Sequence, residues 1–337
     1  MGGDAAQMRG VFLSEMHAAI EALKFLFESS PAAWIATIFV LGLFIGSFLN
    51  VVIHRLPIML ERAWKAEATS ILNEPRTAGG PPAPAAPSPA ASPASDHEAP
   101  APRYNLVVPR SACPKCGAMI TASQNIPVVS FLLLGGKCAR CKAPISARYP
   151  IVEASTAVLS AIVALKFGFT WYCGAALLLT WGLIALSVID FDHQYLPDDI
   201  TLPLLWLGLL ISLVPTIPSI GLPVDPRSSI LGAAAGYLSL WAIYHAFKLI
   251  TGKEGMGYGD FKLFAVFGAW LGWQQLLLII LLSASSGAVV GIALITLRGR
   301  DRNIPIPFGP YLATAGWIAL LWGDELVASY LRFSGMR

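Results

Sequence analysis

Long stretches without a charged residue constrain this chain more than any other feature. A helix needs roughly 20 apolar residues to cross a bilayer, and four uncharged stretches approach that length: 34–53, 172–189, 228–247 and 276–297. Charged residues make up only 13% of the chain, against about 25% in an average soluble domain. Four weaker stretches contain Pro, Gly or a charged residue: 151–171, 200–219, 261–274 and 305–323. We therefore predict an all-α polytopic membrane protein with about eight transmembrane helices.

The Lys and Arg residues predict how these helices are oriented, because loops on the cytoplasmic side carry an excess of both. Outside the predicted helices, Lys and Arg are concentrated in three loops: 54–150, 248–260 and 298–304. The loops that alternate with them, near 168–171 and 215–227, contain only Arg227. This asymmetry places the three basic loops in the cytoplasm and both chain termini outside.

The extramembrane segments differ in composition. Residues 1–33 include apolar residues at helical spacing, which favours an amphipathic surface helix before the first span. Residues 77–102 are rich in Ala and Pro, cannot bury a core and are predicted to be a flexible spacer. Residues 105–150 contain more Cys, Gly and apolar residues. The predicted parts are an N-terminal segment, a first transmembrane helix, a cytoplasmic loop and a membrane domain: 1–33, 34–53, 54–150 and 151–337.

Two C-x-x-C pairs lie in the cytoplasmic loop. They consist of Cys113, Cys116, Cys138 and Cys141, with residues 117–137 between the pairs. Four thiolates at this spacing are typical of a tetrahedral structural zinc site, which leaves no open position for water. Disulfides are disfavoured in the reducing cytoplasm, while an iron site stays an alternative. The segment is too small to be stable by burial alone, so the metal is predicted to hold it together.

Two aspartates stand where an apolar stretch meets a short polar loop. Asp190 ends the stretch 172–189, and Asp260 follows Gly257 and Gly259. Carboxylates at membrane depth are costly and therefore point to function, and the predicted orientation places both at the cytoplasmic face. The glycines support the loop by allowing a substrate strand to approach its backbone closely. We predict that the two carboxyl groups share a proton and activate a water molecule.

Each of these residues also has a simpler explanation. Asp260 could cap the following helix, and Asp190 could merely end a span at the membrane interface. Asp192 lies in the same loop as Asp190 and is its closest rival. Lys262 could support the charged loop around Asp260 or extend its ammonium group to the membrane surface.

Several short motifs accompany these residues. Asp190 lies seven residues before Pro197-Asp198, and Asp260 ends the sequence Gly257-Tyr258-Gly259-Asp260. Further segments contribute to the pattern: 46–57, 125–130, 144–153, 262–265 and 307–310. Together these motifs resemble the type IV prepilin peptidases, a family of bifunctional leader peptidases and N-methyltransferases of the GxGD aspartic type. The tract 77–102 departs from the family pattern and reads as an insertion.

The resemblance implies an enzyme that cleaves the basic leader of prepilins and pseudopilins after a glycine, at the cytoplasmic face of the bacterial inner membrane. It also implies methylation of the new N-terminal residue with S-adenosylmethionine as donor. The chain has no Gly-rich nucleotide-binding motif, so methyl transfer rests on the resemblance. Its candidates lie in the segment 46–57 and in the cysteine-rich loop, and each also has an ordinary helix-end or turn explanation: Asn50, Arg55, Gly136 and Lys137. Membrane lipid is expected around the protein, and a nucleic-acid partner is not.

Three other functions compete with this interpretation. A proton- or cation-coupled transporter would also use intramembrane aspartates, but it would place them near the midplane and usually shows a two-fold repeat. A membrane scaffold that binds an assembly partner would explain the cysteines, but not the Gly-rich aspartate loop. A peptidase without methyltransferase activity is disfavoured by the nearly complete N-terminal cytoplasmic motifs.

Overall fold

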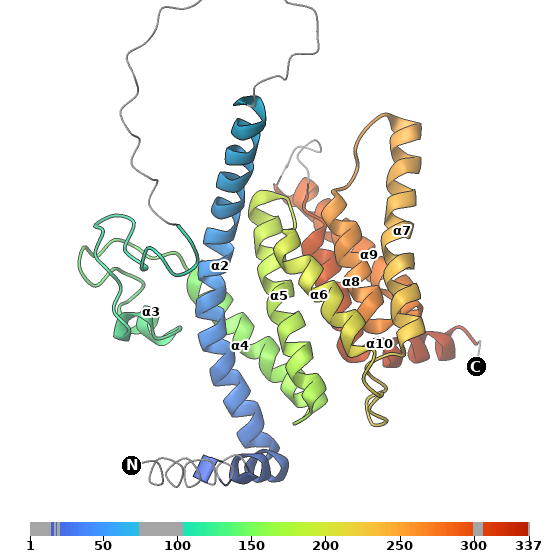
Figure 1. Ribbon diagram of the computed structural model, residues 1–337, viewed down its shortest axis with the longest axis horizontal. Coiled ribbons are helices and arrows are strands. Elements are labelled where there is room, and N and C mark those ends of the chain that lie inside the picture. Colours follow the sequence, from blue (N-terminus) through green and yellow to red (C-terminus); the bar gives the residue numbers. More distant parts are fainter. Residues whose placement is uncertain (1–14, 17, 19–20, 74–103, 299–305, 336–337) are drawn as a thin grey trace, which may run out of the picture.

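The computed structural model describes residues 15–16, 18, 21–73, 104–298 and 306–335. These residues are helical apart from turns, loops and three isolated β-bridges. The long helices of this described part overlap the eight predicted stretches one by one (Figure 1): α2 Pro31–Asn73, α4 Arg148–Phe167, α5 Trp171–His193, α6 Asp198–Ile211, α7 Pro226–Thr251, α8 Tyr258–Leu271, α9 Leu276–Arg298 and α10 Gly309–Phe333. The all-α fold class is confirmed.

Five of the described helices are long and apolar enough to cross a membrane, namely α2, α4, α5, α7 and the segment Trp273–Leu297 that contains α9. The helices α6 and α8 have only 14 residues each. At 1.5 Å per residue they reach about 21 Å, which is shorter than the roughly 30 Å of a bilayer core. The helix α10 is interrupted at Trp322. The protein is therefore a multi-pass membrane protein that also contains short helices.

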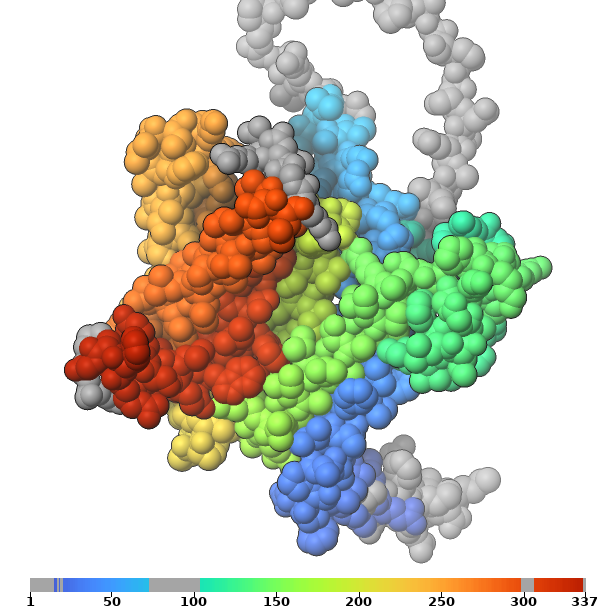
Figure 2. Space-filling model, turned by 180° about the vertical axis from the view of Figure 1, so that it is seen from behind, coloured from blue at the N-terminus to red at the C-terminus, as the bar shows by residue number. Residues whose placement is uncertain are grey.

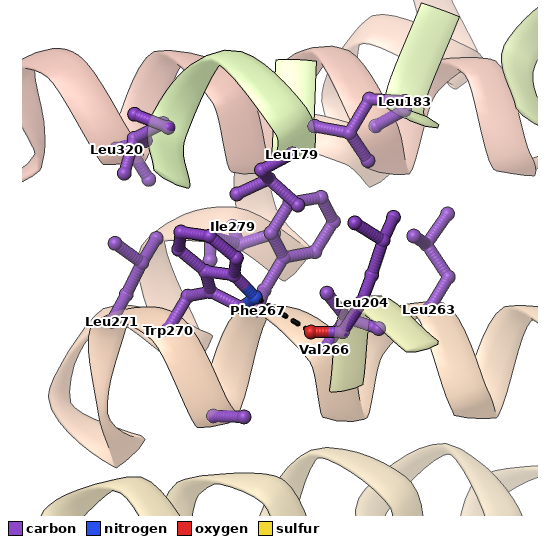
Figure 3. Close-up of a cluster of buried hydrophobic side chains, with 14 of the residues drawn as sticks. Leu179, Leu183, Leu204, Leu263, Val266, Phe267, Trp270, Leu271, Ile279 and Leu320 are labelled. Atoms are coloured by element: carbon purple, nitrogen blue, oxygen red, sulfur yellow. Dashed lines mark hydrogen bonds between the residues drawn. The ribbon is translucent and has the colours of Figure 1, made fainter. Parts of the chain in front are cut away.

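The short helix α8 lies inside the bundle. Every side chain from Asp260 to Leu271 is buried except that of Lys262. The indole N–H of Trp270 donates a hydrogen bond of 2.9 Å to the backbone carbonyl of Leu204 in α6 (Figure 3). These contacts fix the position of α8, and with it the aspartate in its first turn.

Glycines bring the backbones of α7 and α8 into direct contact. A Cβ atom on Gly268 would lie 2.0 Å from the carbonyl oxygen of Gly232, and one on Gly236 would lie 2.7 Å from the carbonyl oxygen of Phe264. Only glycine permits such close approach, as is common where helices pack within membranes. The helices α2 and α4 meet in the same way, because a Cβ atom on Gly46 would lie 2.7 Å from the Cα atom of Glu153.

The first helix is longer than the sequence predicts. We expected the chain to leave the helix after Ile53, but α2 continues through Pro57 to Asn73. A proline inside a helix costs about 3 kcal/mol. The residues that follow Pro57 favour helix, and Glu61 forms an (i, i+4) ion pair with Lys65 at 2.6 Å. Residues 54–73, which the sequence assigns to the cytoplasmic loop, therefore continue the first helix, and this part of α2 extends past the ends of α5 and α6 (Figure 1).

The cysteine-rich subdomain, residues 104–147, lies beside α2 and α4 and apart from the bundle (Figure 2). It contains one turn of 3-10 helix at Ser123–Asn125 and the short helix α3 at Val129–Leu133. Few of its side chains are buried, Ser130 being one of them. The Ala/Pro-rich tract 77–102 lies outside the described residues, as do residues 1–14. Residues 21–29 are helical.

Candidate active site and metal centre

Asp190 lies in the last turn of α5, and only 6% of its surface is exposed. Its carboxylate accepts a hydrogen bond of 3.0 Å from the backbone N–H of Gly309, the first residue of α10. A helix N-terminus carries a partial positive charge, which favours an anion at this position. Asp190 therefore does more than end a span at the interface, because its carboxylate is buried and held by a second helix.

Asp260 lies in the first turn of α8 and is 8% exposed. The cap residue of α8 is Gly257, so Asp260 is not the residue that caps this helix. Its carboxyl group is close enough to that of Asp190 for the two charges to interact electrostatically. The structure thus brings together the two aspartates that the sequence predicts as a pair.

Leu196 packs between Gly259, in the first turn of α8, and Gly309, the first residue of α10. A Cβ atom on Gly259 would lie 2.9 Å from Leu196 Cβ, and one on Gly309 would lie 3.2 Å from Leu196 Cδ2. The same atom on Gly309 would lie 2.6 Å from the Oδ2 atom of Asp190. Both positions therefore require glycine. Gly309 was not predicted as a site residue, and its only signal in the sequence was the motif 307–310.

The neighbouring carboxylates are paired with cations. Arg148 Nη2 contacts Asp192 Oδ2, so Asp192, unlike Asp190, has a cationic partner. Lys262 donates to both carboxylate oxygens of Asp198 at 2.7 Å and thereby joins α8 to α6. In contrast, neither Asp190 nor Asp260 forms an ion pair with any residue that the structure describes.

The four predicted metal ligands converge. The sulfur atoms of Cys113, Cys116, Cys138 and Cys141 all lie within 4.8 Å of one another. The sulfur atoms of Cys113 and Cys141 are 3.8 Å apart, and a Zn–S bond of about 2.3 Å in a tetrahedron gives about 3.8 Å between sulfurs. Backbone N–H groups of Cys141 and Arg140 lower the pKa of Cys138 to about 6. The cluster could therefore hold a metal ion by its thiolates.

Cys173 and two of the methyl-transfer candidates, Asn50 and Arg55, each have a place in the packing or hydrogen bonding of the fold. Cys173 is fully buried in α5. Asn50 donates to the carbonyl of Tyr149 at 3.1 Å, and Arg55 donates to the carbonyl of Asn105 at 2.9 Å. Arg55 thus holds the start of the cysteine-rich subdomain, and Asn50 holds the start of α4 directly after it.

The other two candidates lie next to the second cysteine pair. Gly136 has a positive φ of 68°, which favours glycine. Lys137 forms an isolated bridge with Pro144. Both residues therefore shape the turn that presents Cys138 to the other sulfur atoms.

One further contact between the subdomain and the bundle was missed. Glu153 in α4 is 9% exposed and accepts a hydrogen bond of 2.7 Å from the backbone N–H of Val128. Val128 has φ of 59°, a conformation that is unfavourable for a β-branched residue. The sequence contained one indication of this contact, because Glu153 is a carboxylate inside the otherwise apolar stretch 151–171 and therefore needs a polar partner.

Comparisons with known proteins agree with this arrangement. Residues 40–167 match the bacterial peptidase A24 N-terminal domain, and residues 177–292 match the type IV leader peptidase family. A prepilin leader peptidase/N-methyltransferase of Pseudomonas aeruginosa is 54% identical over 92% of this chain and 97% of its own. A protein of the same name from Aeromonas hydrophila is 54% identical over 89% and 95%. No solved structure gives a significant match.

A relative from Burkholderia pseudomallei strain 1026b, also named prepilin leader peptidase/N-methyltransferase, is 45% identical over 96% of each chain. The two family matches cover both the cysteine-rich subdomain and the two aspartates. The resemblance noted in the motifs is thereby confirmed, and the chain belongs to the type IV leader peptidase family.

Proposed function

We propose that this chain cleaves the leader from prepilins and pseudopilins and then methylates the new N-terminal residue. The observation that carries the peptidase half is the pair Asp190 and Asp260, two buried carboxyl groups that interact with each other and lack an ion-pair partner among the described residues. Two buried carboxylates cannot both stay charged at low cost. Sharing one proton relieves this repulsion and creates an acid and a base together.

Both carboxyl groups accept a backbone N–H at the start of a helix, Asp190 from Gly309 and Asp260 from Gly257. We assign the ionised form to Asp190 and the protonated form to Asp260. Asp190 removes a proton from water while the water oxygen attacks the scissile carbonyl carbon. Asp260 gives its proton to the carbonyl oxygen. The C–N bond then breaks, and the leaving amine takes up a proton from the pair. The products are the free leader and a shortened chain with a new N-terminal amine.

The reaction takes place at the cytoplasmic face, with both termini of this chain outside. The distribution of Lys and Arg supports this orientation. The part of α2 after Pro57 lies near the loop that follows Asp190, since the rings of Trp64 and Tyr195 are 5.7 Å apart. The aspartate pair and the Lys/Arg-rich loop after α2 are therefore on one side. A cationic leader suits an acidic pair at that position.

The cysteine cluster holds a structural zinc ion, because its four thiolates fill a tetrahedron. S-adenosylmethionine supplies the methyl group. Arg55 supports this half of the reaction by attaching the subdomain to α2, and Asn50 supports it by attaching the start of α4, which directly follows the subdomain, to α2. Gly136 and Lys137 support it by shaping the second cysteine turn.

A peptidase without methyl transfer is the nearest alternative. A proton- or cation-coupled transporter is disfavoured, because Asp190 ends α5 and Asp260 begins α8 rather than lying halfway along a spanning helix.

The mass of a prepilin after co-expression with this chain tests both halves together. Loss of the leader mass reports cleavage, and a gain of one methyl group on the shortened chain reports methylation. An intact leader in the presence of well-inserted protein would refute the proposal, and cleavage without the methyl group would leave only its peptidase half.

A further inference from the structure

The short helix α3 of the cysteine-rich subdomain carries its apolar side chains on the outside. Leu132 and Leu133 are 69% and 82% exposed, whereas Ser130, a polar residue, is buried. The hydroxyl group of Ser130 accepts the N–H of Ile126 and donates to the carbonyl of Ser123, so it stays inside the subdomain. A helix that faces water has the opposite arrangement, with its apolar side chains turned inward. The exposed face of α3 therefore needs an apolar neighbour.

Two contacts fix the level of α3 along the spanning helices. Val128, directly before α3, donates its N–H to Glu153 of α4, and the Cα atom of Glu153 lies against Gly46 of α2. Glu153 follows Arg148, the first residue of α4, by five residues. Gly46 precedes the end of the uncharged stretch 34–53 by seven residues. At 1.5 Å per residue these separations are about 7.5 Å and about 10.5 Å, so α3 starts level with the apolar parts of both helices.

The surfaces beside α3 face lipid. Phe44 and Phe48 flank Gly46 in α2 and are exposed. Ile151, two residues before Glu153 in α4, is exposed as well. These side chains belong to spanning helices, where an exposed apolar residue contacts the hydrocarbon of the bilayer. Figure 1 shows α3 level with α4 rather than with the projecting end of α2, so α3 extends this lipid-facing surface.

The backbone of α3 is suited to an apolar environment. Hydrocarbon offers no hydrogen-bond partners, so backbone polar groups there must be satisfied within the protein. The N–H groups of Ser130, Leu132 and Leu134 bond to carbonyl groups one turn earlier in the chain. The N–H group of Val128 bonds to the carboxylate of Glu153. A loop surrounded by water would not need this carboxylate, because water would satisfy the N–H group.

The rest of the subdomain suits lipid head groups. Residues 104–147 contain five Lys or Arg residues, all exposed, and no Asp or Glu: Arg110, Lys115, Lys137, Arg140 and Lys142. A zinc ion with four thiolates would add only two negative charges, so the subdomain stays positive when it holds the metal. Lys and Arg near a membrane surface are attracted to anionic phospholipids. The subdomain thus combines an apolar helix with a cationic surround.

We propose that the cysteine-rich subdomain inserts α3 into the adjoining leaflet of the membrane. Val129, Leu132 and Leu133 lie among the acyl chains, and the Lys and Arg residues of the subdomain bind anionic head groups. The partner is the lipid bilayer itself. This anchoring does not depend on the proposed peptidase and methyl-transfer activities.

Fluorescence quenching tests the proposal in the full chain, reconstituted into liposomes of phosphatidylethanolamine and phosphatidylglycerol. A fluorescent amino acid that absorbs at longer wavelength than tryptophan is incorporated at Leu133 by genetic-code expansion, so that no cysteine is labelled. Lipids brominated on their acyl chains should quench this label, and iodide in the water should not. A label at Leu133 that iodide quenches and brominated lipid does not would overturn the proposal.

Val107 is the matched control position. It is 77% exposed in the same subdomain, but it lies two residues after Asn105, which Arg55 holds beyond the uncharged stretch 34–53. A label at Val107 should therefore be quenched by iodide rather than by brominated lipid. Protection of the Leu133 label from iodide that appears only after prepilin is added, without quenching by brominated lipid, would assign α3 to substrate binding and would also overturn the proposal.

A substituted α3 locates the effect. With the label at Val129, the double substitution Leu132→Gln and Leu133→Gln should weaken quenching by brominated lipid several-fold, because the amides resist entry into hydrocarbon. Val107→Gln should leave this quenching unchanged. Both leucines are exposed, so the zinc content should not change. If the double variant loses its zinc, the comparison of labels at Leu133 and Val107 decides. Undiminished quenching in a zinc-loaded double variant would contradict the insertion of α3.

Discussion

The aspartate end of the bundle and the cysteine-rich subdomain obtain their order in different ways. The aspartates are held by helices that pack backbone to backbone, by buried side chains and by N–H groups at the starts of two helices. The subdomain buries few side chains and is held by four convergent thiols and by contacts to α2 and α4. Burial positions the first region within the membrane domain, while ligation and a few polar contacts position the second.

This difference has a consequence for the two proposed reactions. Damage to the subdomain should leave the packing around the aspartates intact, since the pair is built from α5, α8 and α10. Damage to the aspartate pair should leave the metal cluster intact. The two activities should therefore be separable by substitution in both directions.

The largest expected effect is the loss of cleavage in Asp190→Asn and in Asp260→Asn. Asparagine keeps the size of the side chain but cannot exchange the proton that the pair shares. Removing one member of a cooperating catalytic group should reduce the rate by about 10⁴-fold or more. Processing of a co-expressed prepilin measures this, with zinc content as the readout for the subdomain.

Asp192→Asn is the matched control. Asp192 pairs with Arg148 rather than with a second carboxyl group, so this variant should retain substantial activity. Normal processing of prepilin by Asp190→Asn or by Asp260→Asn would refute the proposal that the two aspartates form a catalytic pair. Loss of activity in Asp192→Asn together with an active Asp190→Asn would move the first catalytic residue to position 192.

Replacing any one cysteine of the cluster with serine should reduce methylation more than cleavage, in contrast to the aspartate variants. We expect about one zinc ion per chain in the wild type, and in Cys113→Ser we expect loss of zinc and a greater loss of methylation than of cleavage. Elemental analysis and the mass of the processed prepilin measure the two outcomes. Cys173→Ala should keep its zinc, since Cys173 lies in α5 away from the cluster. Normal methylation in a zinc-free variant would contradict the role of the metal.

Gly309→Ala tests how strictly packing positions the aspartates. The added Cβ atom would lie 2.6 Å from Asp190 Oδ2, so the carboxylate or the start of α10 must move. A displacement of about 1 Å can cost about 10²-fold in rate, and we expect cleavage to fall by roughly that factor. Gly174→Ala, in the same helix as Asp190, meets open space and should stay active. Full activity of Gly309→Ala would show that this contact does not orient the catalytic group.

Comparison of the sequence with the structure shows which features follow from local sequence patterns and which depend on contacts between distant segments. Apolar stretches located the helices because burial in lipid leaves a continuous pattern along the chain. Asp190 and Asp260 could also be identified from the sequence, because each has a characteristic spacing from the Pro or Gly residues of its motif. The end of α2 could not be predicted in this way. Pro57 is typical of a helix end, and only the helix-favouring residues after it indicate that the helix continues.

Contacts between distant residues could not be predicted in this way. The pair Lys262–Asp198 and the bond from Gly309 to Asp190 join residues that no local pattern connects. The contact between Val128 and Glu153, which sets the level of α3, likewise joins separate segments. The sequence therefore predicts which residues carry chemistry better than it predicts which residues hold them in place.

The smallest effect is expected from removing the Ala/Pro-rich tract 77–102. The sequence predicts a spacer here, because the tract is poor in the large apolar residues whose burial offsets the entropy of ordering. A long surface insertion also adds only a slowly growing closure cost. Replacing it with a short Gly/Ser bridge should leave cleavage and methylation within about twofold of the wild type, because the segments 46–57 and 105–150 flank the tract without including it. A deletion variant that inserts and binds zinc but cannot process prepilin would show that the tract connects the two regions functionally.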